Sequence, residues 1–155
     1  INALQAASHP QTFFGISAEG VASMVSTTGN PYAHMVLRGG DDGPNFDAAS
    51  VAKARTLLEA SGMAPAIVID ASHANCDKNH DRMPEVFADI VEQRVAGQTA
   101  IVGAMLESHL VAGNQKITVD RESMAYGQSV TDPCIGWDTT ERILRAAAER
   151  LRNAP

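Results

Sequence analysis

The sequence lacks the excess of basic residues that binding to nucleic acid or to an anionic membrane normally requires. Lys and Arg number 12 against 18 Asp and Glu, which gives a formal net charge of −6. No apolar run approaches the roughly 20 residues of a membrane span, and no signal peptide is recognisable. We therefore expect neither nucleic acid nor a membrane as partner, and we predict a cytoplasmic location. A small anionic substrate is compatible with this composition, because an acidic protein can still bind phosphate locally.

Cysteine is also scarce. Cys76 and Cys134 are too few for a disulfide framework, which indicates a reducing compartment. Neither an internal repeat nor a domain linker interrupts the 155 residues, so a single domain is expected. Residues 1–8 have the pattern of a helix already in progress, without a capping residue, whereas residues 139–153 end in a natural helix stop. We expect a chain that is cut at its front and complete at its back.

Strand patterns alternate with helix patterns along the chain. Strands are predicted at 34–37, 66–70, 100–106 and 129–131, and helices at 48–60, 84–95 and 139–151. The second and third strands are continuous apolar runs (AIVID and AIVGAML), which are typical of strands buried on both faces. This alternation predicts an α/β protein with about four βα units around a parallel sheet.

One segment departs from this alternation. Two strand-like runs, 13–17 and 21–27, flank Glu19-Gly20, which predicts a β-hairpin before the first βα unit. Residues 13–28 are either an antiparallel edge or an inserted regulatory or interface element, since inserted loops often carry function.

The number of βα units limits the architecture. A (β/α)8 barrel usually needs about 250 residues, so four units cannot close one. Two interpretations follow: the C-terminal half of a barrel completed by an absent N-terminal half, or a small open α/β sheet.

Four polar side chains stand where predicted strands end: Arg38, His73, Glu107 and Asp132. In a parallel barrel the carboxyl ends of successive strands share one rim, so these residues are expected to meet at one pocket. A His, Glu and Asp set suits a divalent ion such as Mn²⁺, Fe²⁺, Co²⁺ or Zn²⁺. The Arg guanidinium suits phosphate or carboxylate.

Each of these residues also has a purely structural interpretation. His73 can be a hydrogen-bonded structural histidine, and Glu107 or Asp132 a helix cap. Arg38 can pair with Asp41 or Asp42 at the surface. It is their shared position at strand ends that favours a site.

Short motifs surround these residues in a fixed order. They are LRGG (37–40), SHAN (72–75), ESHL (107–110) with GNQ (113–115), AYG-S-TD (125–132) and CIGW (134–137). Glycine after Arg38 allows a ligand to approach the backbone closely, and polar neighbours of His73 can fix its tautomer. In order and spacing these motifs resemble the C-terminal half of the type I DAHP (3-deoxy-D-arabino-heptulosonate 7-phosphate) synthases, over essentially the whole chain.

The resemblance implies a (β/α)8 barrel that condenses phosphoenolpyruvate with erythrose 4-phosphate in the shikimate pathway. It makes His73, Glu107 and Asp132 three of four metal ligands, and Arg38 a holder of the phosphoenolpyruvate phosphate. His73 and Arg38 become catalytic residues, and both contact substrate together with Asp132. The family's fourth ligand is a cysteine on an early strand, near a Lys-Pro-Arg-Thr motif, and neither is present here. Neither Cys76 nor Cys134 stands at the family's ligand position.

The resemblance also implies control by an aromatic amino acid near the hairpin, and a homo-oligomer. The corresponding positions are Phe13, Gly15 and Val25. Gly15 occupies a position where phenylalanine-controlled relatives tend to have serine, which favours tyrosine as the effector. Alternatively, Gly15 only relieves crowding in a twisted strand. Two other functions compete: a related metal-dependent sugar-acid phosphate synthase, and a non-catalytic half-barrel module. Without the other half, we expect this chain to be inactive.

Overall fold

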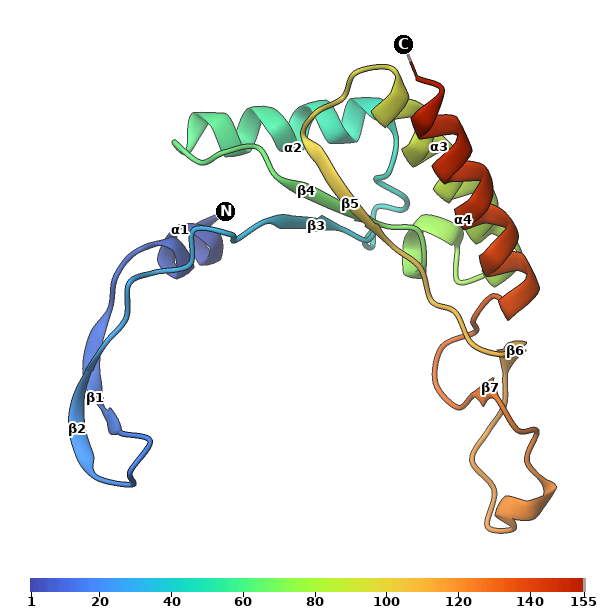
Figure 1. The fold of residues 1–155 in the computed structure, drawn as a ribbon, viewed down its shortest axis with the longest axis horizontal. Coiled ribbons are helices and arrows are strands. Elements are labelled where there is room, and N and C mark those ends of the chain that lie inside the picture. The colour runs from blue at the N-terminus through green and yellow to red at the C-terminus, as the bar shows by residue number, and fades with distance from the viewer. Residues whose placement is uncertain (155) are drawn as a thin grey trace.

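The computed structural model describes residues 1–154, which form an arch whose top is a helix-covered sheet and whose two legs are β-ribbons (Figure 1). The helices are α1 (Asn2–Ser8), α2 (Ala48–Ala60), α3 (Met83–Val95) and α4 (Trp137–Arg152). The strands are β1 (Thr12–Ile16), β2 (Ala22–Ser26), β3 (Met35–Leu37), β4 (Ile67–Asp70), β5 (Ile101–Met105), β6 (Val111–Asn114) and β7 (Gln128–Ser129). Three short 3-10 helices are η1 (His73–Cys76), η2 (His80–Arg82) and η3 (Arg121–Ser123). Pro155 lies outside the described residues.

The sheet at the top of the arch is parallel, with strand order β3-β4-β5. One face is covered by helices: α2 packs on β4, α3 packs on β5, and α4 packs on α3. The core lies in this layer and is built from branched side chains such as Val51, Ile67 and Ile69, all fully buried. No helix within residues 1–154 covers the opposite face, which is open on the inner side of the arch (Figure 1). The sheet is therefore half covered, which is unusual for parallel strands.

The predicted helices and the α/β class agree with the structure, but the number of βα units was wrong. Residues 1–154 contain three such units, β3-α2, β4-α3 and β5-α4, because the expected strand at 129–131 does not join the sheet. In its place, the two-residue β7 pairs with β6, a strand that sequence reasoning did not predict. Residues 106–136 thus form one long βα loop, which makes up the second leg of the arch.

The predicted hairpin is present as the antiparallel pair β1-β2, in a register that places Phe13 opposite Val25 and Gly15 opposite Ser23. Its turn contains Gly20, whose φ of +79° is a left-handed conformation that glycine adopts freely. The hairpin forms the first leg and projects away from the sheet (Figure 1). None of the helices in residues 1–154 is long and apolar enough to cross a membrane.

Helix α2 begins at a capped end. The Asp47 carboxylate accepts hydrogen bonds from the backbone N–H groups of Ala49 and Ser50 and from the Ser50 hydroxyl, at 2.7–3.0 Å. The Ser50 hydroxyl in particular, together with these N–H groups, lowers the pKa of Asp47. Such a cap contributes about 1 kcal/mol.

We predict that Asp47→Ala lowers the free energy of unfolding by about 1 kcal/mol near neutral pH, and that this difference narrows in acid. Because the folded pKa lies below the unfolded one, the contribution of the charge is complete above the unfolded pKa and is lost as the pH falls through the folded pKa. Urea unfolding of the parent and the variant across this range measures it. Asp47→Asn, which keeps an acceptor oxygen but no charge, is the control. A stability difference between the parent and Asp47→Asn that did not change with pH would contradict the account.

Candidate metal and anion site

Three side chains from separate segments meet beside the carboxyl ends of β4 and β5. The ligand atoms of His73, Glu107 and Asp132 all lie within 4.8 Å of one another. His73 Nε2 is 3.4 Å from Glu107 Oε1 and 3.7 Å from Asp132 Oδ2. These are the three residues that the sequence predicts as ligands, and the structure brings them together.

The local backbone explains how each ligand reaches this place. His73 has a left-handed φ of +56°, which turns the chain sharply from β4 into η1. The Glu107 N–H donates to the Ser72 hydroxyl at 3.0 Å, which fixes the residue just after β5. The long loop then returns alongside it, since the Ile135 N–H donates to the Glu107 carbonyl at 3.0 Å. This return places Asp132 next to the other two ligands although β7, the strand that precedes it, lies outside the central sheet.

A fourth residue orients the histidine. Asp70, only 2% exposed, lies 2.8 Å from His73 Nδ1 through its Oδ2 and accepts the Ser72 N–H through its Oδ1. With its proton on Nδ1 facing Asp70, His73 presents the Nε2 lone pair to two carboxylates. That arrangement is repulsive unless a proton or a cation lies between them. The sequence predicts polar neighbours that fix the His73 tautomer, but it does not single out Asp70. The position of Asp70 at the end of an apolar strand is the signal that could have identified it.

The three donors fit a divalent ion. Two ligands about 2.1 Å from a tetrahedral ion lie about 3.4 Å apart, close to the two distances from Nε2. A cavity of about 30 Å³ opens between the three side chains, which is larger than the roughly 10–15 Å³ that one water-sized sphere requires. One nitrogen and two carboxylate oxygens suit Mn²⁺, Fe²⁺, Co²⁺ or Zn²⁺.

The pKa of Glu107 is raised. Partial burial raises the pKa of the Glu107 carboxyl, and the neighbouring Asp132 and Asp70 raise it further, while His73 and Arg38 act in the opposite direction. A partly desolvated carboxylate beside other carboxylates favours a cation partner. Burial likewise raises the pKa of the Cys76 thiol, which lines the same cavity but is not one of the three clustered residues. A protonated, buried thiol is a poor metal ligand.

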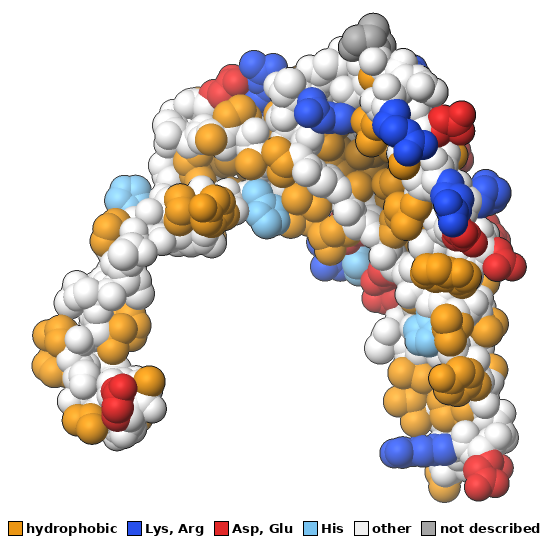
Figure 2. Space-filling view, viewed as in Figure 1, with side chains coloured by type: hydrophobic (Ala, Val, Ile, Leu, Met, Phe, Trp, Pro, Cys, Tyr) orange, Lys and Arg blue, Asp and Glu red, His pale blue; other side chains and the backbone are white. Residues whose placement is uncertain are grey.

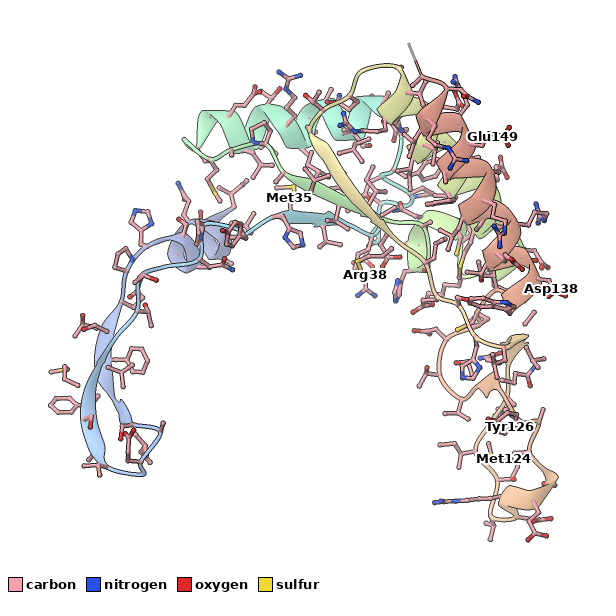
Figure 3. The ribbon with its side chains drawn as sticks, in the orientation of Figure 1. Met35, Arg38, Met124, Tyr126, Asp138 and Glu149 are labelled. Carbon is pink, nitrogen blue, oxygen red and sulfur yellow. The ribbon has the colours of Figure 1, made fainter. Side chains whose placement is uncertain are left out.

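Arg38 lies at the end of β3 and its side chain extends to the open inner side of the arch (Figure 3). The guanidinium is exposed, and it forms no ion pair with Asp41 or Asp42 within residues 1–154. The alternative of a surface ion pair is therefore not seen. Its charge acts on Glu107, so Arg38 faces the same side as the cluster and is available for an anion.

The chain belongs to the DAHP synthetase I family, whose model matches residues 1–145. It is 41% identical to the Tyr-sensitive phospho-2-dehydro-3-deoxyheptonate aldolase of Salmonella typhimurium, over 94% of this chain and 40% of that protein. It is also 41% identical to the Phe-sensitive aldolase of Escherichia coli, over 98% of this chain and 43% of that protein.

Similarity extends to solved structures. The phospho-2-dehydro-3-deoxyheptonate aldolase of Francisella tularensis superposes with a TM-score of 0.89 at 36% identity, over 99% of this chain and 44% of that one. The chain therefore spans less than half the length of the relatives that it matches. These matches confirm the resemblance to this family that the short motifs indicated.

Proposed function

We propose that these residues form the C-terminal part of a (β/α)8 barrel that condenses phosphoenolpyruvate with erythrose 4-phosphate to give DAHP and phosphate. The observation that carries this proposal is the convergence of His73, Glu107 and Asp132 beside the carboxyl ends of β4 and β5, in a chain of the DAHP synthetase I family. Activity requires the complete barrel, because the family's cysteine ligand and Lys-Pro-Arg-Thr motif lie outside this chain.

Unpaired strand edges support the barrel. Within residues 1–154, β3 and β5 pair only with β4, so each keeps an edge without a partner. Apolar side chains lie along the concave edge of the arch (Figure 2). Val36 of β3 and Met105 of β5 keep 41% and 46% of their surface exposed. Three strands leave five to be supplied before a barrel of eight can close. If these precede residue 1, the first strand of the barrel pairs with β5 and brings its residues beside Glu107.

Within that barrel, each residue of this chain has a distinct task. A bound divalent ion supplies Lewis acidity toward the aldehyde of erythrose 4-phosphate. His73, Glu107 and Asp132 hold the ion, and Asp70 keeps the imidazole in the tautomer that it needs. Arg38 holds the phosphoenolpyruvate phosphate through its planar fork and offsets the repulsion between two anionic substrates. Carbon 3 of phosphoenolpyruvate then attacks the aldehyde, and water adds at carbon 2 as phosphate leaves.

Substrate consumption by the complete protein tests the proposal. We expect loss of phosphoenolpyruvate that depends on erythrose 4-phosphate, with one phosphate released for each molecule consumed. A related sugar-acid phosphate synthase would instead respond to a longer sugar phosphate. A non-catalytic module would consume neither phosphoenolpyruvate nor a sugar phosphate. The presence of all three clustered residues, together with an exposed Arg38, disfavours that role.

We further propose that the hairpin, residues 13–28, binds an aromatic amino acid effector. Phe13 is opposite Val25 in the ribbon, and a Cβ on Gly15 would lie 3.0 Å from Val25 Cγ2 and 3.3 Å from the Phe13 ring. The three residues thus share one face of the ribbon. A missing side chain at Gly15 leaves room for the phenol oxygen of tyrosine, and equally relieves crowding against Val25.

The homo-oligomer and the cytoplasmic location stay predictions.

We predict that Gly15→Ser in the complete enzyme weakens tyrosine inhibition by about tenfold, because a displaced, unpaired phenol hydroxyl costs roughly 1–3 kcal/mol. Inhibition curves with tyrosine and phenylalanine on the parent and the variant measure the change. Thr12→Ser, on the opposite face of the same strand, is the matched control. If the order of inhibitor potency stayed the same in Gly15→Ser, crowding relief alone would explain the glycine.

A further inference from the structure

One buried amide joins the ends of β3 and β4. Asn75 is fully buried, and its Nδ2 donates to the Leu37 carbonyl at 3.1 Å and to the Asp70 carbonyl at 2.7 Å. Leu37 immediately precedes Arg38, and Asp70 is the residue that orients His73. A single side chain therefore contacts both the strand end that presents the anion-binding arginine and the strand end that presents the metal-binding histidine.

A second amide extends this connection to the turn after Arg38. The Asn75 Oδ1 accepts the Asn45 N–H at 2.7 Å, and the Asn45 Oδ1 accepts the Gly39 N–H, also at 2.7 Å. Arg38 thus lies between two residues that are tied to Asn75, Leu37 directly and Gly39 through Asn45. All polar atoms of the Asn75 side chain are used in this network.

Packing makes the same connection rigid. Gly39 has a left-handed φ of +72°, and a Cβ there would lie 2.6 Å from the Ala74 Cβ and 2.9 Å from the Ala74 carbonyl carbon. The turn after Arg38 therefore rests directly on η1, the element that begins with His73. Neither turn can shift by much without moving the other, because both the hydrogen bonds and the close approach would be lost.

We propose that Asn75 is a positioning residue that sets the distance between the anion-binding Arg38 and the metal-binding His73, with Asn45 as its extension to the Arg38 turn. This inference rests on the proposed function, since it takes its two ligands from that site. The chemistry requires an asparagine: two N–H donors face two carbonyls while one oxygen accepts an N–H. An aspartate would place an acceptor against two carbonyl oxygens, and alanine would remove the hydrogen bonds of all three backbone groups to this side chain.

The two asparagines make different predictions. Asn45→Ala removes only the support of Gly39, so it should raise the dissociation constant of phosphoenolpyruvate about fivefold, with Mn²⁺ affinity and kcat within about twofold of the parent. Asn75→Ala removes the link to both strand ends, so it should weaken phosphoenolpyruvate and Mn²⁺ together, each by about tenfold.

Calorimetric titration of the complete protein with Mn²⁺, and of the Mn²⁺-loaded protein with phosphoenolpyruvate, measures both constants. Gln93→Ala is the matched control, because its amide donates to the Phe46 carbonyl at 2.8 Å in the same loop but contacts neither strand end. It should lower stability without moving either constant. If Asn75→Ala fails to fold, the dissociation constant of phosphoenolpyruvate for Asn45→Ala is sufficient to test the inference.

The inference is overturned if Asn45→Ala binds phosphoenolpyruvate like the parent, or if Gln93→Ala weakens it equally. Failure of the proposed function has a different signature: the parent would bind neither Mn²⁺ nor phosphoenolpyruvate, or His73→Ala would bind Mn²⁺ unchanged. If the parent binds both Mn²⁺ and phosphoenolpyruvate, and Asn45→Ala binds phosphoenolpyruvate as tightly as the parent, only the positioning role is rejected.

Discussion

We expect each of the three alanine variants of the metal site to lower Mn²⁺ affinity by at least about 100-fold and to remove synthase activity in the complete barrel. The variants are His73→Ala, Glu107→Ala and Asp132→Ala. Each change deletes one of three ligand atoms that lie within 4.8 Å of one another, and leaves the remaining carboxylates or imidazole without the cation that balances them. Metal content after dialysis and direct titration with Mn²⁺ measure the loss.

Two controls separate the metal site from its surroundings. His80→Ala changes a histidine seven positions further along the chain whose nearest acidic partner is Asp81, 3.6 Å away, so metal binding should be unchanged. Arg38→Ala should keep full metal stoichiometry and raise the Michaelis constant for phosphoenolpyruvate by roughly 10- to 100-fold, since a charge-assisted hydrogen bond is lost. An Arg38→Ala variant that lost metal but kept substrate affinity would show that the two roles are reversed.

Replacing Asp70 with asparagine should weaken Mn²⁺ binding by about 10- to 100-fold although Asp70 never touches the ion. The carboxylate holds the proton on His73 Nδ1 from 2.8 Å, and an amide in its place is uncharged and can turn its own donor toward the ring. The imidazole then loses both its fixed tautomer and part of its basicity. Competition between Mn²⁺ and a coloured chelator measures the affinity.

An exposed carboxylate provides the comparison for that experiment. Asp81→Asn makes the same chemical change at the surface, where the side chain is 82% exposed, and it should leave Mn²⁺ affinity unaltered. Equal affinities for the parent and Asp70→Asn would mean that the histidine is oriented by its left-handed backbone alone and that Asp70 serves only packing.

Much of the site was predictable because it follows from chain periodicity. Apolar runs indicated β4 and β5, and polar residues shortly after them, His73 and Glu107, fell at one edge of the sheet as parallel strands require. Asp132 was also predicted as a ligand, but for an incorrect structural reason. Asp132 lies on a long loop and does not follow a fourth barrel strand. The hydrogen bond from the Ile135 N–H to the Glu107 carbonyl brings this loop back to the sheet, and no local sequence pattern predicts that bond.

The supporting residues were harder to predict. Asn75 and Asp70 are buried polar groups, and Asn75 has a partner 38 residues away, so their roles depend on contacts that exist only after folding. Strand β6 escaped prediction because VAGN includes a glycine and an asparagine, both disfavoured in strands, and it is held by pairing with β7 rather than by its own propensity.

The most direct test of the central claim is phosphate release by the complete enzyme after all metal has been removed with a chelator. The account predicts no release from phosphoenolpyruvate and erythrose 4-phosphate until Mn²⁺ is restored, and no recovery on adding Mn²⁺ to a folded Glu107→Ala variant. Undiminished phosphate release by the metal-free parent, or by Glu107→Ala, would contradict the assignment of His73, Glu107 and Asp132 as the metal site of this enzyme.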